Sequence, residues 1–285
     1  MTVRDNSTRF AVPPPNVPQE DIEETPNAPS PAESLHFVVP TEFVEIPSKG
    51  LLYPEGHPLH NQEEIEIKLM TAKEEDILVN KSLLKKGIAL DRMLQSLIVD
   101  KRIKLDDLLV SDKNALIIAA RISAYGAEYK TQIKCPGCGM DNQYNFDLED
   151  KKIKYLYDHG RDDVQVAENG NFLITLPKTQ MRVEFRLLRG RDENRLLQKS
   201  KKNKGEIALT DQFKTFIVAI NGVTDPKTMA QFIDVMPAYD SKYLRLTYGA
   251  VVPSVDLKQY FECAECDYSQ DVEVPFTVEF FWPRS

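Results

Sequence analysis

Two cysteine motifs decide the fold of this chain: Cys135-Pro136-Gly137-Cys138-Gly139 and Cys263-Ala264-Glu265-Cys266-Asp267. Strand-like runs flank both motifs, so each pair of cysteines is expected at the tip of a hairpin. Zinc binds four thiolates tetrahedrally, and a spacer of two residues lets both sulfurs of a tight turn reach one ion. The pattern therefore predicts a single structural zinc ion bound by Cys135, Cys138, Cys263 and Cys266.

Other uses of the four cysteines are weaker interpretations of the same motifs. A closed site of four thiolates has no open position for a substrate, which argues against catalytic zinc. Redox chemistry would need one pair near a βαβ unit and a helix N-terminus, whereas both pairs are expected between strands. Free buried thiols, or a site that loses its metal in a mature assembly, are the remaining alternatives.

The charge and hydropathy of the chain argue against several classes of partner. A formal net charge of −8 disfavours nucleic acid and anionic lipid, because phosphate binding depends on accumulated positive charge. No stretch approaches the roughly 20 uninterrupted apolar residues of a membrane helix. Residues 1–20 lack the apolar segment of a secretory signal, so we expect a cytoplasmic protein without a membrane partner.

The chain is expected to divide into a tail and two ordered parts. Residues 1–34 are rich in proline and acidic side chains, and this composition predicts a disordered tail. Residues 35–127 are expected to form a strand and turn segment followed by helices. In residues 128–285, the hairpins 128–148 and 258–276 are expected to form a zinc ribbon around an α+β insert, residues 149–257. The fold class is therefore α+β, with mixed helices and antiparallel hairpins.

Local signals predict the first two helices. Thr71 and Glu74 have the spacing of a capping box, so one helix is expected from Thr71 towards Leu84, ending at Gly87. A second helix follows from five apolar side chains that share one face at helical spacing. They are Leu90, Met93, Leu94, Leu97 and Ile98.

Two later helices are predicted in the same way. Ser111-Asp112 is expected to cap a helix that stops at Gly126. Thr210 is expected to cap another that ends at Asn221-Gly222. Four apolar side chains should share one face of that last helix: Phe213, Phe216, Ile217 and Ile220.

The sequence contains no recognised catalytic or phosphate-binding motif. Its four histidines belong to no zinc-protease motif and lie beside no Gly-x-Ser-x-Gly elbow. Neither Gly-x-x-x-x-Gly-Lys nor Gly-x-Gly-x-x-Gly occurs, so a nucleotide-driven activity is not indicated. We therefore expect a protein that is not an enzyme and has no small-molecule substrate.

Several longer motifs accompany the cysteine pairs. They are Phe43-Val44-Glu45-Ile46-Pro47-Ser48-Lys49-Gly50-x-x-Tyr53-Pro54, Met70-Thr71-Ala72-Lys73-Glu74-Glu75-Asp76-Ile77-Leu78, Ser82-Leu83-Leu84-Lys85-Lys86-Gly87, Asp112-Lys113-Asn114-Ala115, Tyr125-Gly126-Ala127-Glu128-Tyr129 and Phe185-Arg186-Leu187-Leu188-x-Gly190-Arg191-Asp192-Glu193. With the first cysteine pair, these motifs resemble the T-even-type phage baseplate hub assembly protein family over most of the chain after Leu35.

This resemblance implies a non-enzymatic assembly protein. Such a protein binds other baseplate hub and tail proteins to build the central hub of a contractile phage tail, as an assembly chaperone or a minor hub component. Its expected location is the host cytoplasm during phage assembly, and the baseplate of the virion if it stays in the particle. The alternative is a zinc-ribbon regulator that binds nucleic acid, which would need a basic and aromatic face on the ribbon.

Overall fold

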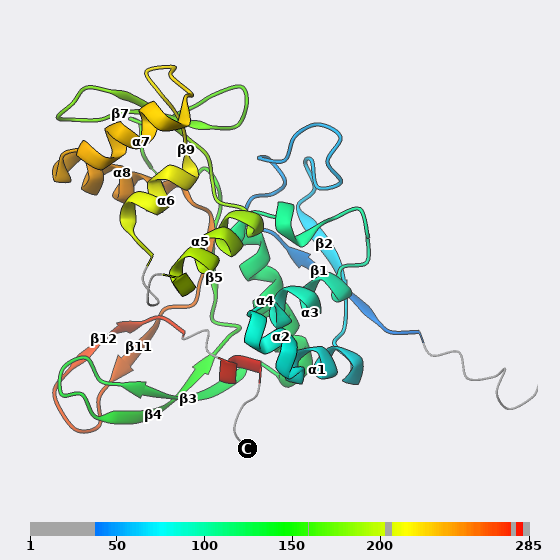
Figure 1. Ribbon diagram of the computed structural model, residues 1–285. Helices are drawn as coiled ribbons and strands as arrows, with labels where there is room; N and C mark the ends of the chain where they lie inside the picture. The colour runs from blue at the N-terminus through cyan, green and yellow to red at the C-terminus, as the bar shows by residue number, and fades with distance from the viewer. Residues whose placement is uncertain (1–37, 159, 203–206, 275–277, 282–285) are drawn as a thin grey trace, which may run out of the picture. The chain divides into compact units, whose positions relative to one another are not determined.

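Short antiparallel sheets alternate with helices in this α+β protein (Figure 1). The computed structural model describes residues 38–158, 160–202, 207–274 and 278–281. The predicted tail, residues 1–34, lies outside the described residues. In the described part of the chain, no helix combines the length and the hydropathy that a membrane span requires.

The strands form five antiparallel sheets in the described residues. Their bounds are β1 Thr41–Glu45, β2 Glu64–Lys68, β3 Glu128–Lys134, β4 Asp141–Asp147, β5 Lys152–Lys154, β6 Gln165–Val166, β7 Phe172–Thr175, β8 Arg182–Phe185, β9 Ile217–Ile220, β10 Ser254–Asp256, β11 Gln259–Glu262 and β12 Ser269–Val272. Four sheets are pairs: β1–β2, β3–β4, β5–β10 and β11–β12. The fifth has the order β6-β7-β8-β9.

Helices occur in both halves of the chain. Their bounds are α1 Ala72–Val79, α2 Lys81–Lys86, α3 Ala89–Leu97, α4 Val110–Tyr125, α5 Gly190–Lys202, α6 Leu209–Phe216, α7 Pro226–Val235 and α8 Ala238–Val251, with short 3-10 turns η1 Leu105–Asp107 and η2 Val278–Phe281. Helix α4 contacts elements from distant parts of the chain, namely β1, α3, α5, β10 and η2. Residues from both sides of the first cysteine pair contribute to one hydrophobic core.

The predicted apolar stripe of α3 is confirmed. Met93, Leu94, Leu97 and Ile98 are at most 1 % exposed, and Leu90 packs against the core from its edge. Burial of this stripe explains why α3 is stable although it is only nine residues long.

The single helix predicted from Thr71 towards Leu84 is wrong, because the chain breaks at Asn80. The side-chain oxygen of Asn80 accepts hydrogen bonds from the N–H groups of Ser82 and Leu83, at 3.0 and 3.1 Å. Asn80 therefore ends α1 and starts α2 as its N-cap. Gly87, which was predicted to end the helix, ends α2 and has the left-handed conformation.

The helix predicted to run from Thr210 to Ile220 is also shorter than expected. Phe213 and Phe216 are buried on α6, but Ile217 and Ile220 belong to strand β9, which pairs with β8. The side chains of Ile217, Val218 and Ile220 are β-branched, and the edge of β8 provides them with a ladder of hydrogen bonds. Helical spacing alone could not distinguish the two arrangements.

Asp112 does not cap α4, because its side chain turns into the core. The helix starts at Val110, with Leu109 at the N-cap position. The carboxylate of Asp112 is fully buried and accepts hydrogen bonds from the N–H and hydroxyl of Ser48, at 3.1 and 2.6 Å, and from the hydroxyl of Tyr53, at 2.7 Å. The Tyr53 hydroxyl in turn accepts from the N–H of Leu109, at 3.0 Å. We call these four residues the Asp112 network.

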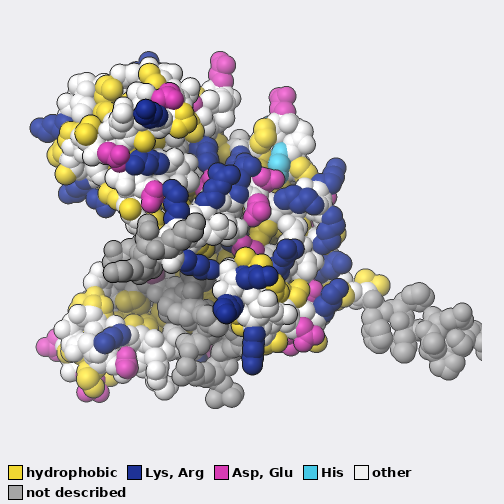
Figure 2. Space-filling model, viewed as in Figure 1, with side chains coloured by type: hydrophobic (Ala, Val, Ile, Leu, Met, Phe, Trp, Pro, Cys, Tyr) yellow, Lys and Arg dark blue, Asp and Glu magenta, His cyan; other side chains and the backbone are white. Residues whose placement is uncertain are grey.

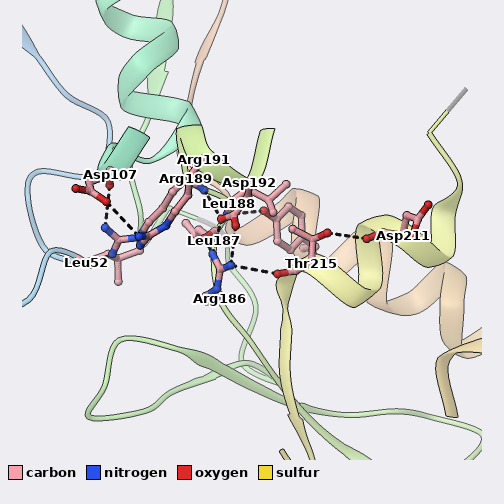
Figure 3. Close-up of polar contacts among 11 residues, drawn as sticks. Leu52, Asp107, Arg186, Leu187, Leu188, Arg189, Arg191, Asp192, Asp211 and Thr215 are labelled. Carbon is pink, nitrogen blue, oxygen red and sulfur yellow. Dashed lines mark hydrogen bonds and ion pairs between the residues drawn. The ribbon is translucent and has the colours of Figure 1, made fainter. Parts of the chain in front are cut away.

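A second cluster of polar side chains lies where the chain enters α5. Figure 3 shows Arg189 pointing to the carbonyl oxygens of Leu52 and Asp107, which accept its hydrogen bonds at 3.3 and 2.8 Å. Arg186 points to Asp192, whose carboxylate accepts two hydrogen bonds at 2.6 and 2.9 Å. The guanidinium of Arg189 also lies over the ring of Tyr53, so this group adjoins the Asp112 network.

Because the Asp112 network joins distant parts of the chain, removing the Asp112 carboxylate should destabilise the folded protein as a whole. Asp112→Ala leaves the donors of Ser48 and Tyr53 buried without an acceptor, and the free energy of unfolding should fall by about 3 kcal/mol or more. The change in the free energy of unfolding is measured by chemical denaturation, with the same m value for the variant and the unmodified protein. The control is Asp76→Ala on the exposed face of α1, which should leave the midpoint unchanged. Equal midpoints for the two variants would contradict a stabilising Asp112 network.

Candidate metal centre

Two hairpins bring the cysteines together at their turns. In the first, β3 and β4 pair from Glu128↔Asp147 to Lys134↔Asp141, which leaves residues 135–140 as the turn. In the second, β11 and β12 pair up to Glu262↔Ser269, which leaves residues 263–268. Figure 1 shows the two hairpins close together at lower left, with both turns at the same end.

Backbone hydrogen bonds close each turn in a similar way. The N–H of Cys135 donates to the carbonyl of Met140 at 2.8 Å, and the N–H of Cys263 donates to that of Tyr268 at 3.0 Å. The N–H of Gly139 donates to the carbonyl of Cys135 at 2.9 Å, and Gly139 has a positive φ of 77°. A glycine fits this position because side chains strain the backbone at positive φ.

The sulfurs of the four cysteines lie close enough together to bind one metal ion. Sγ of Cys135 lies 3.8 Å from Sγ of Cys266, and Sγ of Cys138 lies 3.7 Å from Sγ of Cys263. All four sulfurs lie within 4.8 Å of one another. Four thiolates at about 2.3 Å from one ion in tetrahedral geometry are about 3.8 Å apart, whereas a disulfide needs about 2.05 Å. The thiol cluster, Cys135, Cys138, Cys263 and Cys266, can therefore hold one metal ion.

Backbone amides point at the sulfurs from within each turn. The N–H of Gly137 donates to Sγ of Cys135 at 3.3 Å, and the N–H of Glu265 donates to Sγ of Cys263 at 3.4 Å. In both turns the donor is two residues after the first cysteine. Such donors favour the charged thiolate and so prepare the sulfur for a metal.

Asn142 joins the first hairpin to the second turn. Its amide nitrogen lies 3.5 Å from Sγ of Cys263 and donates to the carbonyl of Met140 at 3.1 Å. Its amide oxygen accepts from the N–H of Ala264 at 3.1 Å. The side chain is buried, so Asn142 fixes the two turns relative to each other.

Close packing fixes the hairpins below the thiol cluster. Tyr268 covers Gly137 so closely that a Cβ on Gly137 would lie 2.9 Å from that of Tyr268. The hydroxyl of Tyr144 donates to the carbonyl of Tyr260 at 2.7 Å, and the rings of Tyr144 and Phe261 pack against each other in a T-shaped pair. Glycine is required at position 137 because of this contact, a reason that spacing alone does not give.

The pKa values of the cysteines differ across the cluster. The pKa of Cys263 falls to about 6, first because the N–H of Glu265 donates to its sulfur. A hydrogen bond from the N–H of Tyr268 acts to lower the pKa of Cys266, but burial and the neighbouring sulfurs outweigh it and raise the value to about 12. The lowered pKa of Cys263 favours its thiolate, which is the form of the side chain that binds a metal ion.

The structure brings together all four cysteines that the sequence predicts as ligands. Cys135 and Cys263 are buried, whereas Cys138 is exposed, so the cluster lies at the surface. Metal binding itself stays a prediction. Among the described residues, no other set of three or more histidine, cysteine, aspartate or glutamate side chains converges in this way. Asn142 could not be identified from the sequence, because nothing in the spacing of the cysteines points to it.

The comparisons with known proteins give one family. A family model described as T4 bacteriophage base plate protein matches residues 44–282, from β1 through the last cysteine pair. No curated protein and no solved structure matches the chain.

Loss of the Asn142 side chain should weaken metal binding without removing a ligand. Asn142→Ala deletes the contact to Cys263 and the bond to Ala264, and the affinity of the thiol cluster for a divalent metal should fall about 10–100-fold. Competition with a coloured chelator measures the affinity. Asn145→Ala, an exposed change on the same strand, is the control and should have no effect. Equal affinities for both variants would show that Asn142 does not support the cluster.

Proposed function

The chain belongs to the T4 bacteriophage base plate protein family, and we propose that it acts by binding other hub proteins while the central hub of a contractile phage tail is built. In this role it is an assembly chaperone or a minor hub component rather than an enzyme. It would act in the host cytoplasm during assembly and, if it stays in the particle, in the baseplate of the tail. The observation that carries the proposal is the family match over residues 44–282.

The positions of the motifs support a role in recognition by shape. Three motifs from distant parts of the chain, residues 43–54, 112–115 and 185–193, meet around the Asp112 network and the adjoining arginines. Their buried polar groups bond to one another and to backbone carbonyls. They therefore maintain a surface rather than forming a group of reactive side chains in a pocket.

Several large apolar side chains are exposed and available to protein partners. They include Phe43 on β1, Tyr239 and Leu246 on α8, and Tyr260 on β11, each about 60 % exposed or more. Tyrosine and phenylalanine are enriched at protein interfaces, because a rigid ring buries a large area at low entropic cost. Such side chains suit a protein that works by binding other proteins.

We further propose that the thiol cluster holds one structural zinc ion. Zinc prefers four thiolates in tetrahedral geometry, and the sulfur–sulfur distances of 3.8 and 3.7 Å fit a bond length of about 2.3 Å. Bound zinc would supply a closed coordination shell that ties residues 135–138 to residues 263–266. Structural zinc contributes about 10 kcal/mol or more of apparent binding free energy. That is comparable with the whole stability of an ordinary domain.

The alternative role, a regulator that binds nucleic acid, lacks support in the charges of the hairpins. The two hairpins carry Lys130 and Lys134 against seven acidic residues: Glu128, Asp141, Asp147, Glu262, Glu265, Asp267 and Asp271. Lys130 lies beside Glu128 at 3.8 Å. In Figure 2 the visible face of the hairpins shows both signs and no continuous patch of lysine and arginine. A surface of this charge repels phosphate.

Elemental analysis of protein purified under reducing conditions should find about one zinc per chain. Cys138→Ser should lose the ion and lower the stability of both hairpins together, because one ion clamps both turns. Glu265→Gln, an exposed change between two of the cysteines, should keep the zinc. A fully folded protein with less than about a tenth of an equivalent of zinc would contradict the structural role.

Phage that lack this protein should make heads but fail to complete baseplates. Cys138→Ser should reproduce the defect if the zinc clamp holds the surface that partners recognise, whereas Glu265→Gln should not. Electron microscopy of lysates and particle counts measure the outcome. Normal tails without the protein would rule out the assembly role. Tight, salt-dependent binding to nucleic acid with no affinity for hub proteins would favour the regulator.

A further inference from the structure

A small cleft lies beside strand β1. Its volume is about 280 Å³, and α4, β5 and β10 contribute its other walls. Small or apolar side chains form most of the surface: Val44, Ala115, Ile118, Ala119, Ile122, Ile153 and Val255. Sites for small molecules usually occupy about 300–1,000 Å³. This β1 cleft is smaller, so it has room for side chains of a peptide rather than for a cofactor.

The strand beside the cleft has a free edge. Ile46 donates to the carbonyl of Glu63 and Leu69 donates to that of Pro40, both at 2.9 Å, so these positions form hydrogen-bonded pairs. Such pairs alternate with unbonded ones along an antiparallel ladder. The N–H and C=O groups of Phe43 therefore point away from β2, as do those of its neighbours two residues away. No described strand pairs with that edge of β1.

The cleft also contains a buried carboxylate oxygen without a hydrogen bond. Glu42 lines the cleft, and its Oε1 is buried without a donor within reach. Lys151 lines the cleft as well, but it does not donate to this oxygen of Glu42 in the described part of the chain. A buried acceptor without a donor destabilises the folded protein, and more strongly when the group is charged. A cation from outside would remove that cost.

One end of the cleft is fixed. The hydroxyl of Tyr155, which follows β5, donates to the carboxylate of Glu45 at 2.6 Å. The amino group of Lys49 lies 4.4 Å from the centre of the Tyr155 ring. These contacts hold the wall formed by β5 to the end of β1, so the cleft exists before anything binds to it.

We propose that the β1 cleft receives an extended segment of a partner baseplate protein, which adds a strand to the free edge of β1 and places a lysine or arginine against Glu42. The free N–H and C=O groups of Phe43 suit strand addition, in which backbone bonds give affinity and side-chain pockets give specificity. The carboxylate of Glu42 suits a cation by charge complementarity. This inference rests on the proposed function, because the partner is one of the proteins with which the chain assembles.

The exposed ring of Phe43 is further support for a binding site at this edge of β1. Phe43 is 67 % exposed on a strand whose neighbouring residue, Val44, is buried in the core. A free edge with an exposed aromatic side chain is a hazard for aggregation unless a partner covers it. The acidic groups Glu42 and Glu45 at the same place disfavour nucleic acid, so a protein segment is the occupant that fits.

Hydrogen exchange of two adjacent amides tests the proposal directly. In the isolated full chain, the amide of Phe43 should exchange rapidly, while that of Val44 should be slow because it bonds to β2. In the complex purified with tail proteins from infected cells, exchange at Phe43 should slow by at least about tenfold. The Val44 amide is the internal control and should change little.

Two matched variants test the cation. Glu42→Gln should weaken the complex roughly tenfold, because a charge-assisted hydrogen bond becomes a neutral one. Glu64→Gln, an exposed carboxylate on β2 outside the cleft, should leave affinity unchanged. If Glu42→Gln and Lys151→Gln instead destabilise the isolated chain equally, Glu42 pairs with Lys151 in solution and the proposal is overturned.

The other outcomes separate this inference from the proposed function. Association with hub proteins without protection at Phe43 overturns the cleft proposal and leaves the assembly role intact. No association with any tail protein overturns both. Protection of Phe43 in the isolated chain that disappears when residues 1–37 are removed identifies the chain's own segment as the occupant. Protection that grows with concentration of the isolated chain identifies a second copy.

Discussion

The fold depends on the buried carboxylate of Asp112. A fully buried carboxylate is costly unless it is hydrogen-bonded, and Asp112 receives three hydrogen bonds from a loop more than 50 residues earlier in the chain. Burial raises the pKa of Asp112, and the donors of Ser48 and Tyr53 oppose the rise. Because these bonds can form only when the loop and the start of α4 are both in place, they couple the first strands to the central helix.

Helix α4 extends this coupling to the hairpins. Near its other end, the guanidinium of Arg121 is fully buried and donates to the carbonyl oxygens of Gly126, Glu128 and Phe280. Glu128 is the first residue of β3, whose far end carries Cys135. One helix therefore holds the polar network at its start and the base of the first hairpin at its end. At the far end of this hairpin the thiol cluster brings Cys138 to 3.7 Å from Cys263, so segments distant in the sequence meet there as well.

Those parts of the structure that depend on local patterns, or on the characteristic spacing of metal-binding cysteines, could be predicted from the sequence. Cysteine spacing identified four thiols that the fold brings together, and helical spacing found the buried stripe of α3. The errors arose where a distant partner decides the outcome. The local sequence around Asp112 predicts a helix cap, and only the contacts with Ser48 and Tyr53 show that its side chain is buried. The spacing of Ile217 and Ile220 predicts a helix, and only the pairing with β8 shows that they belong to a strand. Asn142 has no local signal, because its role exists only when both turns meet.

The segment that the Asp112 network fixes is also the segment that presents a free strand edge. Residues 43–54 turn Ser48 and Tyr53 inward to Asp112, while Phe43 points its ring to solvent a few residues earlier. An exposed edge strand is easily displaced unless its other side is firmly attached, because its unpaired N–H and C=O groups contribute little to its stability. The buried hydrogen bonds supply that attachment, and the bond from Tyr155 to Glu45 adds a second one on the far wall. A surface held in this way loses little conformational entropy when a partner strand binds, so more of the interaction energy appears as affinity. Residues 43–54 therefore serve both the core and the surface, which gives a physical reason for one segment to combine buried polar side chains with an exposed aromatic ring.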